Sequence, residues 1–167
     1  MFRNAEAWGG RTAVTANGVS YTYNRLLRDS GAMANRICQV LGTDDLNEAH
    51  IGFLADPGYE YTVMQWAVWR SGGCAVPLCN THPEDELEYT LTDSECALTL
   101  ATPSRESLVS GVANKIGRPF ELITTEAQED SGCAFPELPL DRRAMIIYTS
   151  GTTGRPKGNA DLPVKCW

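Results

Sequence analysis

Residues 148–158 carry most of the chemistry that can be read from this sequence. They read Tyr-Thr-Ser-Gly-Thr-Thr-Gly-Arg-Pro-Lys-Gly and directly follow a short apolar segment. Glycines let backbone N–H groups approach a ligand closely, hydroxyls add hydrogen-bond donors, and a lysine supplies a compact positive charge. A triphosphate presents many anionic oxygens within a short distance and needs this combination of groups. The run therefore predicts a phosphate-binding loop.

Neither of the two better-known phosphate-binding motifs matches this run. A Walker loop requires Gly-Lys followed by Ser or Thr, whereas Lys157 lies between Pro156 and Gly158. The sequence also contains no Gly-x-Gly-x-x-Gly. A flexible surface turn that binds nothing could have the same content of Ser, Thr and Gly. Composition alone leaves both interpretations open.

The order of the residues resembles the phosphate-binding signature of the adenylate-forming superfamily, and all eleven positions fit it. This superfamily includes acyl-CoA and aryl-CoA synthetases, peptide-synthetase adenylation domains and luciferases. The resemblance extends from about residue 2 to 158 and includes the block 66–78 and the segment 86–94. These upstream blocks are most similar to those of mitochondrial malonyl-CoA synthetases. The loop indicates the superfamily. The assignment of the acyl group depends on the upstream blocks alone.

The resemblance implies a ligase that joins a carboxylic acid to coenzyme A in fatty acid metabolism. The acid attacks the α-phosphate of ATP, which binds with Mg²⁺, to form an acyl-adenylate and pyrophosphate, and coenzyme A then displaces AMP. The implied partners are ATP, coenzyme A and a short-chain acid or dicarboxylic acid. In this family the loop holds the β- and γ-phosphates, positioning them and neutralising their charge. The resemblance implies that the residues of this sequence that bind the ATP phosphates are Thr149, Ser150, Gly151, Thr152, Thr153, Gly154 and Lys157.

After Gly158 the sequence departs from the family, which continues with an apolar stretch and a helix. Residues 159–167 include Pro163 and show no helical periodicity. We expect residues 1–158 to form part of an AMP-binding adenylation domain and residues 159–167 to be a tail from outside the family. Such a truncated synthetase is expected to contain neither catalytic residues nor a metal site and to be inactive alone. The alternative is a non-catalytic fragment that binds a nucleotide or a partner.

Other residues have functional interpretations that the sequence does not favour. His82 before Pro83 could be catalytic, but this position is typical of a cap or a surface residue. Trp66 and Trp69 could form an aromatic binding face, but their helical spacing favours the core.

The acidic and cysteine residues do not predict a metal site. Three consecutive acids at 84–86 suit the first turn of a helix, where they are solvated. The six cysteines contain no Cys-x-x-Cys pair, and Cys74 and Cys79 are not spaced as a redox pair. Cys38, Cys74 and Cys96 lie in apolar segments, where a reduced cysteine acts as a small core residue.

A phosphate loop needs rigid elements to hold it, and the alternation of segments upstream supplies them. Residues 144–148 form an apolar run typical of a fully buried strand. The other expected elements are strands at 51–55, 74–78, 96–101 and 120–124 and helices at 59–71, 83–92 and 104–116. This alternation predicts an α/β fold with a mostly parallel, doubly wound sheet. Residues 149–158 should then be an irregular loop at the C-terminal end of the strand at 144–148, where such sheets bind ligands.

A β-hairpin is expected before this sheet, and a mobile connection near its end. Segments 12–16 and 19–22 favour strands, and Asn17-Gly18 between them accepts the positive φ angles of a type I′ turn. Thr22 should cap a helix that ends at Gly42. Residues 126–143 contain prolines, glycines and scattered acids without periodicity, which indicates a mobile connection.

The bulk properties exclude two classes of partner. The chain has 167 residues, of which 43% are hydrophobic, enough for one folded domain. Its net charge of −7 provides no basic field to attract nucleic acid. Its apolar runs are shorter than the roughly 20 residues that cross a bilayer.

The first residues have no feature of a signal peptide or a mitochondrial presequence. A mitochondrial location therefore rests on the resemblance, and a cytoplasmic one is the alternative.

Overall fold

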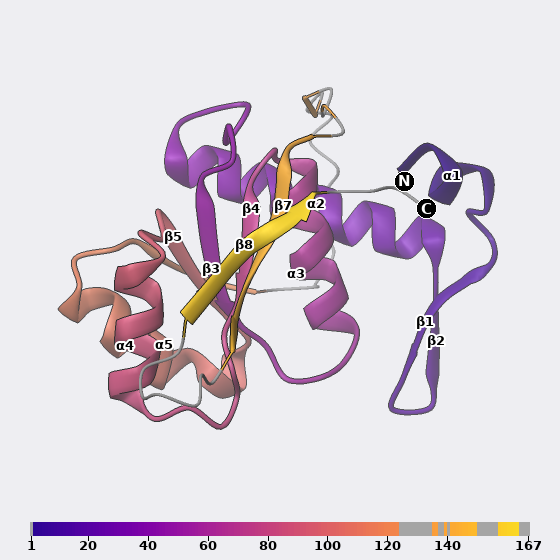
Figure 1. Ribbon diagram of the computed structural model, residues 1–167. Coiled ribbons are helices and arrows are strands. Elements are labelled where there is room, and N and C mark those ends of the chain that lie inside the picture. Colours follow the sequence, from indigo (N-terminus) through magenta and orange to yellow (C-terminus); the bar gives the residue numbers. More distant parts are fainter. Residues whose placement is uncertain (1, 124–134, 137–138, 140, 150–156, 164–167) are drawn as a thin grey trace.

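The computed structural model describes residues 2–123, 135–136, 139, 141–149 and 157–163. For residues 157 and 159–163 the description covers only the backbone. The chain forms a six-stranded sheet with helices on both faces, and a separate two-stranded hairpin lies at one side (Figure 1).

The hairpin has the predicted bounds. It consists of β1 (Thr12–Ala16) and β2 (Val19–Thr22), which pair in antiparallel fashion. Asn17 and Gly18 between them have φ angles of 53° and 76°, as the type I′ turn requires. A short helix, α1 (Phe2–Ala7), precedes the hairpin and was not predicted from the sequence.

The helix after the hairpin, α2 (Tyr23–Leu41), begins and ends where the capping residues predict. The hydroxyl oxygen of Thr22 accepts a hydrogen bond from the backbone N–H of Arg25 at 3.3 Å. At the other end Gly42 adopts the left-handed conformation, and its N–H bonds back to the last turn.

The main sheet confirms the predicted α/β class. Its strand order is β6-β5-β3-β4-β7-β8, and every neighbouring pair is parallel except β7 and β8. The strands are β3 (His50–Leu54), β4 (Cys74–Pro77), β5 (Leu98–Ala101), β6 (Phe120–Leu122), β7 (Arg143–Thr149) and β8 (Lys157–Pro163).

The helices between these strands are close to their predicted positions. They are α3 (Tyr59–Arg70), α4 (Glu84–Asp93), a short 3₁₀ turn η1 (Pro103–Arg105) and α5 (Glu106–Lys115). The single helix expected at 104–116 is thus divided into a 3₁₀ turn and α5. Strand β5 begins two residues later than expected, because the N–H of Cys96 still bonds to the Leu91 carbonyl and closes α4.

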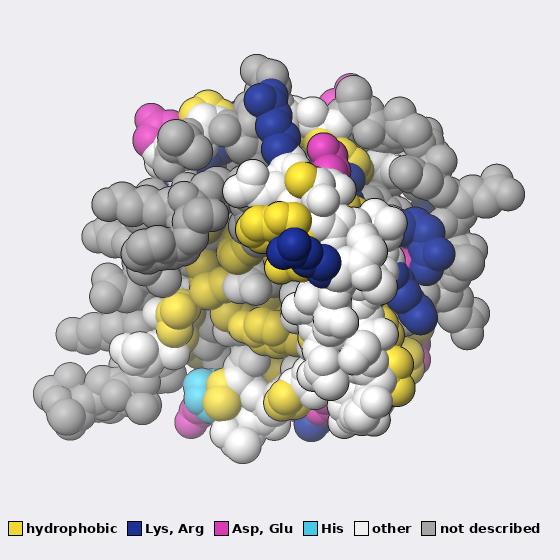
Figure 2. Space-filling model, turned by 90° about the vertical axis from the view of Figure 1, so that its right-hand side faces the viewer, with side chains coloured by type: hydrophobic (Ala, Val, Ile, Leu, Met, Phe, Trp, Pro, Cys, Tyr) yellow, Lys and Arg dark blue, Asp and Glu magenta, His cyan; other side chains and the backbone are white. Residues whose placement is uncertain are grey.

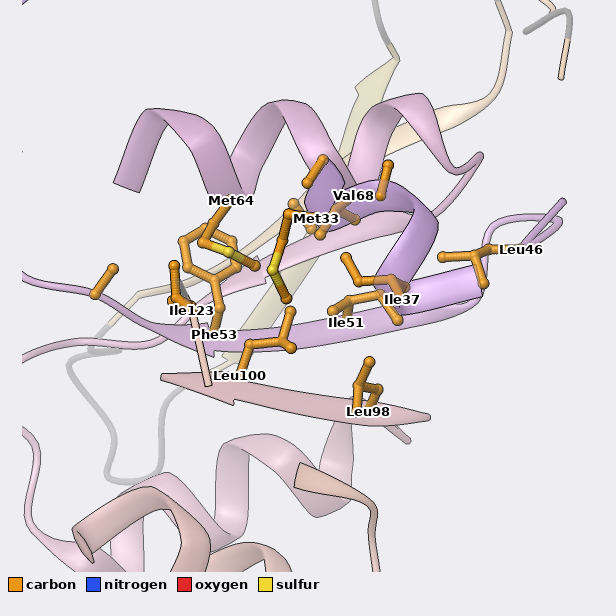
Figure 3. Close-up of a cluster of buried hydrophobic side chains, with 14 residues drawn as sticks. Met33, Ile37, Leu46, Ile51, Phe53, Met64, Val68, Leu98, Leu100 and Ile123 are labelled. Atoms are coloured by element: carbon orange, nitrogen blue, oxygen red, sulfur yellow. The ribbon is translucent and has the colours of Figure 1, made fainter. Parts of the chain in front are cut away.

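Helices α2 and α3 cover one face of the sheet, and α4 and α5 cover the other. On β3, Ile51 and Phe53 pack with the first pair of helices, while Leu54 packs with the second. Figure 3 shows the first cluster, in which Met33, Ile37, Met64 and Val68 from the helices meet the β3 and β5 side chains. Each fully buried side chain of this kind contributes about 1.5–3 kcal/mol, so the two layers hold the sheet firmly. The fold is doubly wound, as predicted.

Most of the expected connection at 126–143 lies outside the described residues. Among its described residues, Phe135 contacts Arg70. The guanidinium carbon of Arg70 lies over the Phe135 ring, 4.2 Å from the ring centre. Arg142 and Arg143 form ion pairs with residues before β3, and Arg143 is already the first residue of β7. The mobility of the remainder stays a prediction.

Candidate functional site

Strand β7 carries the predicted phosphate loop at its C-terminal end. It lies between β4, with Ala75 opposite Met145, and β8, so its interior position in the sheet is confirmed. The expectation of a fully buried strand is wrong. Successive side chains of a strand face opposite sides of the sheet, and Ile146 packs in the layer of α4 and α5 while Ile147 is 39% exposed. Near the loop, β7 is therefore buried on one face.

The two ends of the loop are strands and not irregular chain. Thr149 is the last residue of β7 and lies opposite Lys157, the first residue of β8, and Tyr148 lies opposite Gly158. The prediction of an irregular loop over 149–158 is therefore wrong at both ends, because antiparallel pairing satisfies the backbone groups of these residues. Ser150, Gly151, Thr152, Thr153 and Gly154 lie outside the described residues.

The residues after the loop also pair with β7. Residues 159–163 continue β8, with Asn159 opposite Ile147 and Pro163 opposite Arg143. Residues 164–167 lie outside the described residues. The strand forms through contacts with β7, which no local pattern in the sequence indicates.

Tyr148 connects the base of the loop to α4. Its hydroxyl donates a 2.7 Å hydrogen bond to Oδ2 of Asp93, the last residue of α4. Burial, and then the Asp93 carboxylate, raise the pKa of the Tyr148 hydroxyl above its usual value. Gly158 lies against the same ring, since a Cβ at this position would be 2.9 Å from Cζ of Tyr148.

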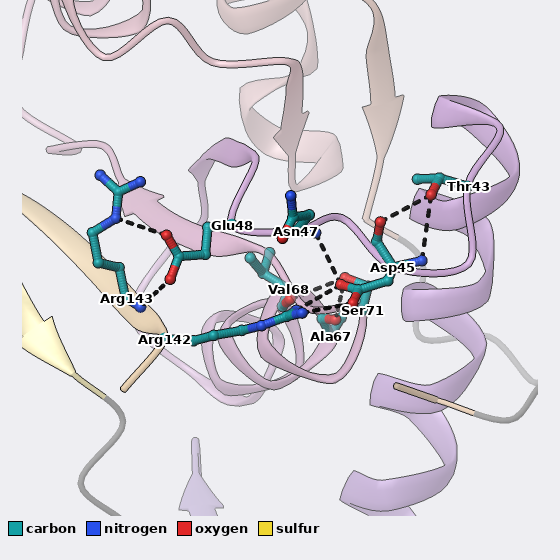
Figure 4. Close-up of polar contacts among 9 residues, drawn as sticks. All are labelled: Thr43, Asp45, Asn47, Glu48, Ala67, Val68, Ser71, Arg142 and Arg143. Atoms are coloured by element: carbon teal, nitrogen blue, oxygen red, sulfur yellow. Dashed lines mark hydrogen bonds and ion pairs between the residues drawn. The ribbon is translucent and has the colours of Figure 1, made fainter. Parts of the chain in front are cut away.

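The N-terminal end of β7 is fixed by two ion pairs (Figure 4). Arg142 bonds through both terminal nitrogens to the carboxylate of Asp45, at 2.6 and 2.7 Å. Arg143 donates to Glu48 from its backbone N–H and its side chain, at 2.9 and 3.0 Å. The hydrogen bonds from Arg142 lower the pKa of Asp45, and those from Arg143 lower that of Glu48.

A third contact to the start of β7 comes from a predicted candidate. The indole N–H of Trp69 donates a 2.7 Å hydrogen bond to the carbonyl oxygen of Ala144. Trp66 is only 7% exposed and packs with the residues of the hairpin, which confirms its assignment to the core. Trp69 is half-buried and links α3 to β7, a role that its helical spacing did not reveal.

The remaining candidates lie at the N-terminal end of α4. His82 lies two residues before α4, with Nδ1 3.3 Å from Oε2 of Glu86. Glu84 and Asp85 are exposed, as predicted for a solvated first turn. Searching the described residues finds no group of three or more His, Cys, Asp or Glu side chains that could hold a metal ion.

The cysteines differ in their surroundings. Cys74 and Cys96 are buried, and burial raises the pKa of each thiol to about 11. Cys38 is half-buried on α2. Cys79 is exposed and bonds to the Thr81 hydroxyl, which lowers the pKa of its thiol. The expectation that Cys74 and Cys96 are core residues is confirmed.

Comparison with known families decides what this arrangement belongs to. The family model described as AMP-binding enzyme matches residues 1–160, which is nearly the whole chain. The chain belongs to the AMP-binding enzyme family. The matched residues include the helices on both faces of the sheet, strand β7 and the first residues of strand β8.

Curated members of the family give more detail. The chain is 39% identical over 168 residues to malonate–CoA ligase ACSF3, mitochondrial, of Xenopus laevis, and 39% identical over 166 residues to that of Homo sapiens. It is 36% identical over 176 residues to malonate–CoA ligase of Arabidopsis thaliana. The two ACSF3 alignments cover 95% of this chain and 29% of each relative. The chain therefore spans less than a third of the length of the curated relatives it matches.

Solved structures of the family have the same fold. The structure of apo MatB from Rhodopseudomonas palustris matches with a TM-score of 0.72 and 27% identity, covering 91% of this chain and 32% of that one. ATP-bound MatB from the same organism matches with a TM-score of 0.72 and 26% identity, covering 95% and 34%. Within its described residues, the chain contains no helix of the length and apolarity needed to cross a membrane.

Proposed function

We propose that this chain is the phosphate-binding part of an ATP-dependent acid–CoA ligase whose acid is malonate. One observation carries the proposal: the run 148–158 connects two paired strands at the carboxyl end of a parallel sheet. In open α/β sheets ligands bind at the carboxyl ends of the strands, and the run supplies the hydrogen-bond donors that a triphosphate needs. The similarity to curated malonate–CoA ligases supports malonate as the acid.

In this proposal the loop binds ATP through its β- and γ-phosphates. Lys157 supplies positive charge, Ser and Thr hydroxyls donate hydrogen bonds, and the glycines give access to backbone N–H groups. The residues assigned are Thr149, Ser150, Gly151, Thr152, Thr153, Gly154 and Lys157. None of them acts as a nucleophile, and their role is to hold pyrophosphate as it leaves.

The other reactants are proposed from the family. The magnesium ion would enter with ATP, as the resemblance to the family implies. Malonate would attack the α-phosphate, and coenzyme A would then take the acyl group from the adenylate. A mitochondrial location is proposed because the ACSF3 relatives are described as mitochondrial, and fractionation of cells that express the natural gene tests it.

Isothermal titration of the 167-residue chain with MgATP tests the proposal. We expect Lys157→Ala to weaken ATP binding by about tenfold or more, because a charge-assisted hydrogen bond contributes about 1.5–3 kcal/mol. Lys115→Ala is the matched control, since Lys115 lies on α5 in an ion pair with Glu88. Absence of ATP binding by the wild-type chain, or equal affinity in the Lys157→Ala variant, would contradict the assignment.

Malonate-dependent exchange between ATP and pyrophosphate measures catalysis in the same preparations. We expect no exchange from a polypeptide of these 167 residues, because adenylation requires both reactants to be held in line. ATP binding without exchange would agree with a part of the ligase that does not complete the reaction alone. Turnover that disappears in the Lys157→Ala variant would show that the chain is an active ligase.

A further inference from the structure

Two tyrosine hydroxyls converge on the carboxylate of Asp93. Tyr148 reaches Oδ2 from strand β7 at 2.7 Å, and Tyr89 reaches Oδ1 from the preceding turn of α4 at 3.4 Å. Only the first of these bonds connects two elements that are distant in the sequence. Asp93 is the last residue of α4, and α4 packs on the sheet through Leu87 and Leu91. The carboxylate is therefore a fixed acceptor for the Tyr148 hydroxyl.

The ring of Tyr148 also contacts the strand that leaves the loop. Gly158 lies opposite Tyr148 in the pairing of β7 and β8. A Cβ at residue 158 would be 2.9 Å from Cζ and 3.1 Å from the hydroxyl oxygen of Tyr148. An alanine at this position would therefore have to displace the ring or the strand. We call Tyr148, Asp93 and Gly158 together the tyrosine anchor.

We propose that Tyr148 is a positioning residue, which holds the two ends of the phosphate loop together through the tyrosine anchor. The pair next to it, Thr149 and Lys157, closes the loop and contains two of the residues assigned to ATP binding. The effect on ATP binding rests on the function proposed above. The effect on the loop ends does not.

The physical reason is pre-organisation. Bringing the ends of a flexible segment together has an entropic cost, and a ligand that must order the segment loses that free energy from its affinity. A tyrosine that contacts α4 through its hydroxyl and β8 through its ring restricts both ends before ATP arrives. The Tyr148 hydroxyl is protonated at neutral pH, as in an unperturbed tyrosine, and burial and the Asp93 carboxylate raise its pKa further.

Hydrogen exchange measured by mass spectrometry on the 167-residue chain tests the anchor without ATP. Tyr148→Phe removes the hydroxyl and keeps the ring, and we expect exchange in peptides covering 146–160 to become about three- to tenfold faster. Tyr89→Phe is the matched control, because it removes the other hydroxyl on Asp93 but lies on α4 itself. Exchange in peptides from α5 separates a local effect from a general loss of stability.

Three outcomes would overturn the proposal. They are unchanged exchange at 146–160 in Tyr148→Phe, an equal increase in Tyr89→Phe, and an increase spread over all peptides. In titrations with MgATP we expect Tyr148→Phe to weaken binding by about three- to tenfold and Tyr89→Phe to leave it unchanged. If the wild-type chain does not bind ATP, the proposed function fails, and the exchange data still decide whether the anchor exists.

A double substitution provides an independent check. Gly158→Ala should accelerate exchange at 146–160, because the added methyl group displaces the Tyr148 ring from Asp93. Tyr148→Phe in that background should then add little, since both changes break the same contact. Full additivity of the two effects would show that Gly158 and the Tyr148 hydroxyl act separately, and it would contradict the anchor.

Discussion

Arg142 joins the start of β7 to a loop far away in the sequence. Its guanidinium bonds to both carboxylate oxygens of Asp45, a residue 97 positions earlier. The Arg142 side chain is 18% exposed and that of Asp45 is 34% exposed, so solvent screens the pair only in part. The two parallel hydrogen bonds give the contact a defined geometry, which a single exposed ion pair does not have.

Arg142→Met should lower the free energy of unfolding by about 1 kcal/mol, the upper range for a partly exposed pair. Arg143→Met is the matched control. Its side chain is 46% exposed, and its backbone bond to Glu48 remains after substitution, so we expect a loss of less than about 0.5 kcal/mol. Urea unfolding followed by circular dichroism measures both. Equal losses in the two variants would show that the Asp45 pair has no special role.

At the scale of the elements, α2 offers a clean test of local capping. The Thr22 hydroxyl accepts a hydrogen bond from the Arg25 N–H at the first turn. Thr22→Ala should reduce the free energy of unfolding by about 1 kcal/mol, whereas Thr22→Ser should retain most of it because serine caps equally well. Chemical denaturation measures the change. A serine variant as unstable as the alanine variant would assign the effect to the lost methyl group.

The elements that the sequence predicts well are those with local signals. Asn17-Gly18 fixed the hairpin, and Thr22 and Gly42 gave the ends of α2, because each of these residues acts on its immediate neighbours. Helix α1 was missed since six residues give too little periodicity. Strand β8 was missed because its residues have weak strand propensity and form a strand only against β7.

In the candidate site, too, the sequence predicts the features that depend on neighbouring residues and does not predict the long-range contacts. The chemistry of the loop and its place at the end of β7 follow from a contiguous run of residues. The contacts that hold β7 do not, because Asp93 lies 55 positions before Tyr148 and Asp45 lies 97 positions before Arg142. No local pattern of residue types indicates such pairings, which depend on how the helices pack against the sheet.

For the whole molecule, the distribution of charge predicts how it responds to acid. Asp45, Glu48 and Asp56 all have a pKa below its usual value, mainly because each accepts hydrogen bonds from an arginine or, for Asp56, first from Ser104. A carboxylate whose pKa is lower in the folded state stabilises the fold above its unfolded pKa, near 4. This contribution is lost as the pH falls through the folded pKa.

We therefore expect the melting temperature to fall as the pH decreases below about 4. Arg142→Met removes the partner of Asp45, so its melting temperature should fall less than that of the wild type between pH 6 and pH 3, by about 2–4 °C. Differential scanning calorimetry at several pH values measures this. Parallel declines in the two proteins would show that Asp45 titrates normally in the folded chain.

Some large hydrophobic side chains are exposed on the surface of the molecule. Figure 2 shows hydrophobic side chains exposed over the middle of one face, with arginine or lysine beside them. Among the described residues, the large hydrophobic side chains with the greatest exposure are Trp8, Val19 and Ile147. Trp8 follows α1, Val19 begins β2, and Ile147 is on β7, so the exposure is spread over the elements at both ends of the chain.

The pairing of β7 with β4 has a consequence for the time at which the edge of β4 can be covered during synthesis on the ribosome. Ala75 of β4 is synthesised 70 residues before its partner Met145 of β7, and at 5–20 residues per second this separation corresponds to about 4–14 seconds. During that interval the nascent chain can already form the hairpin, α2 and the β3–β4 pair, but β4 has an open edge. Among the described strands, β7 and β8 are thus the ones that cover this edge, and they flank the phosphate loop.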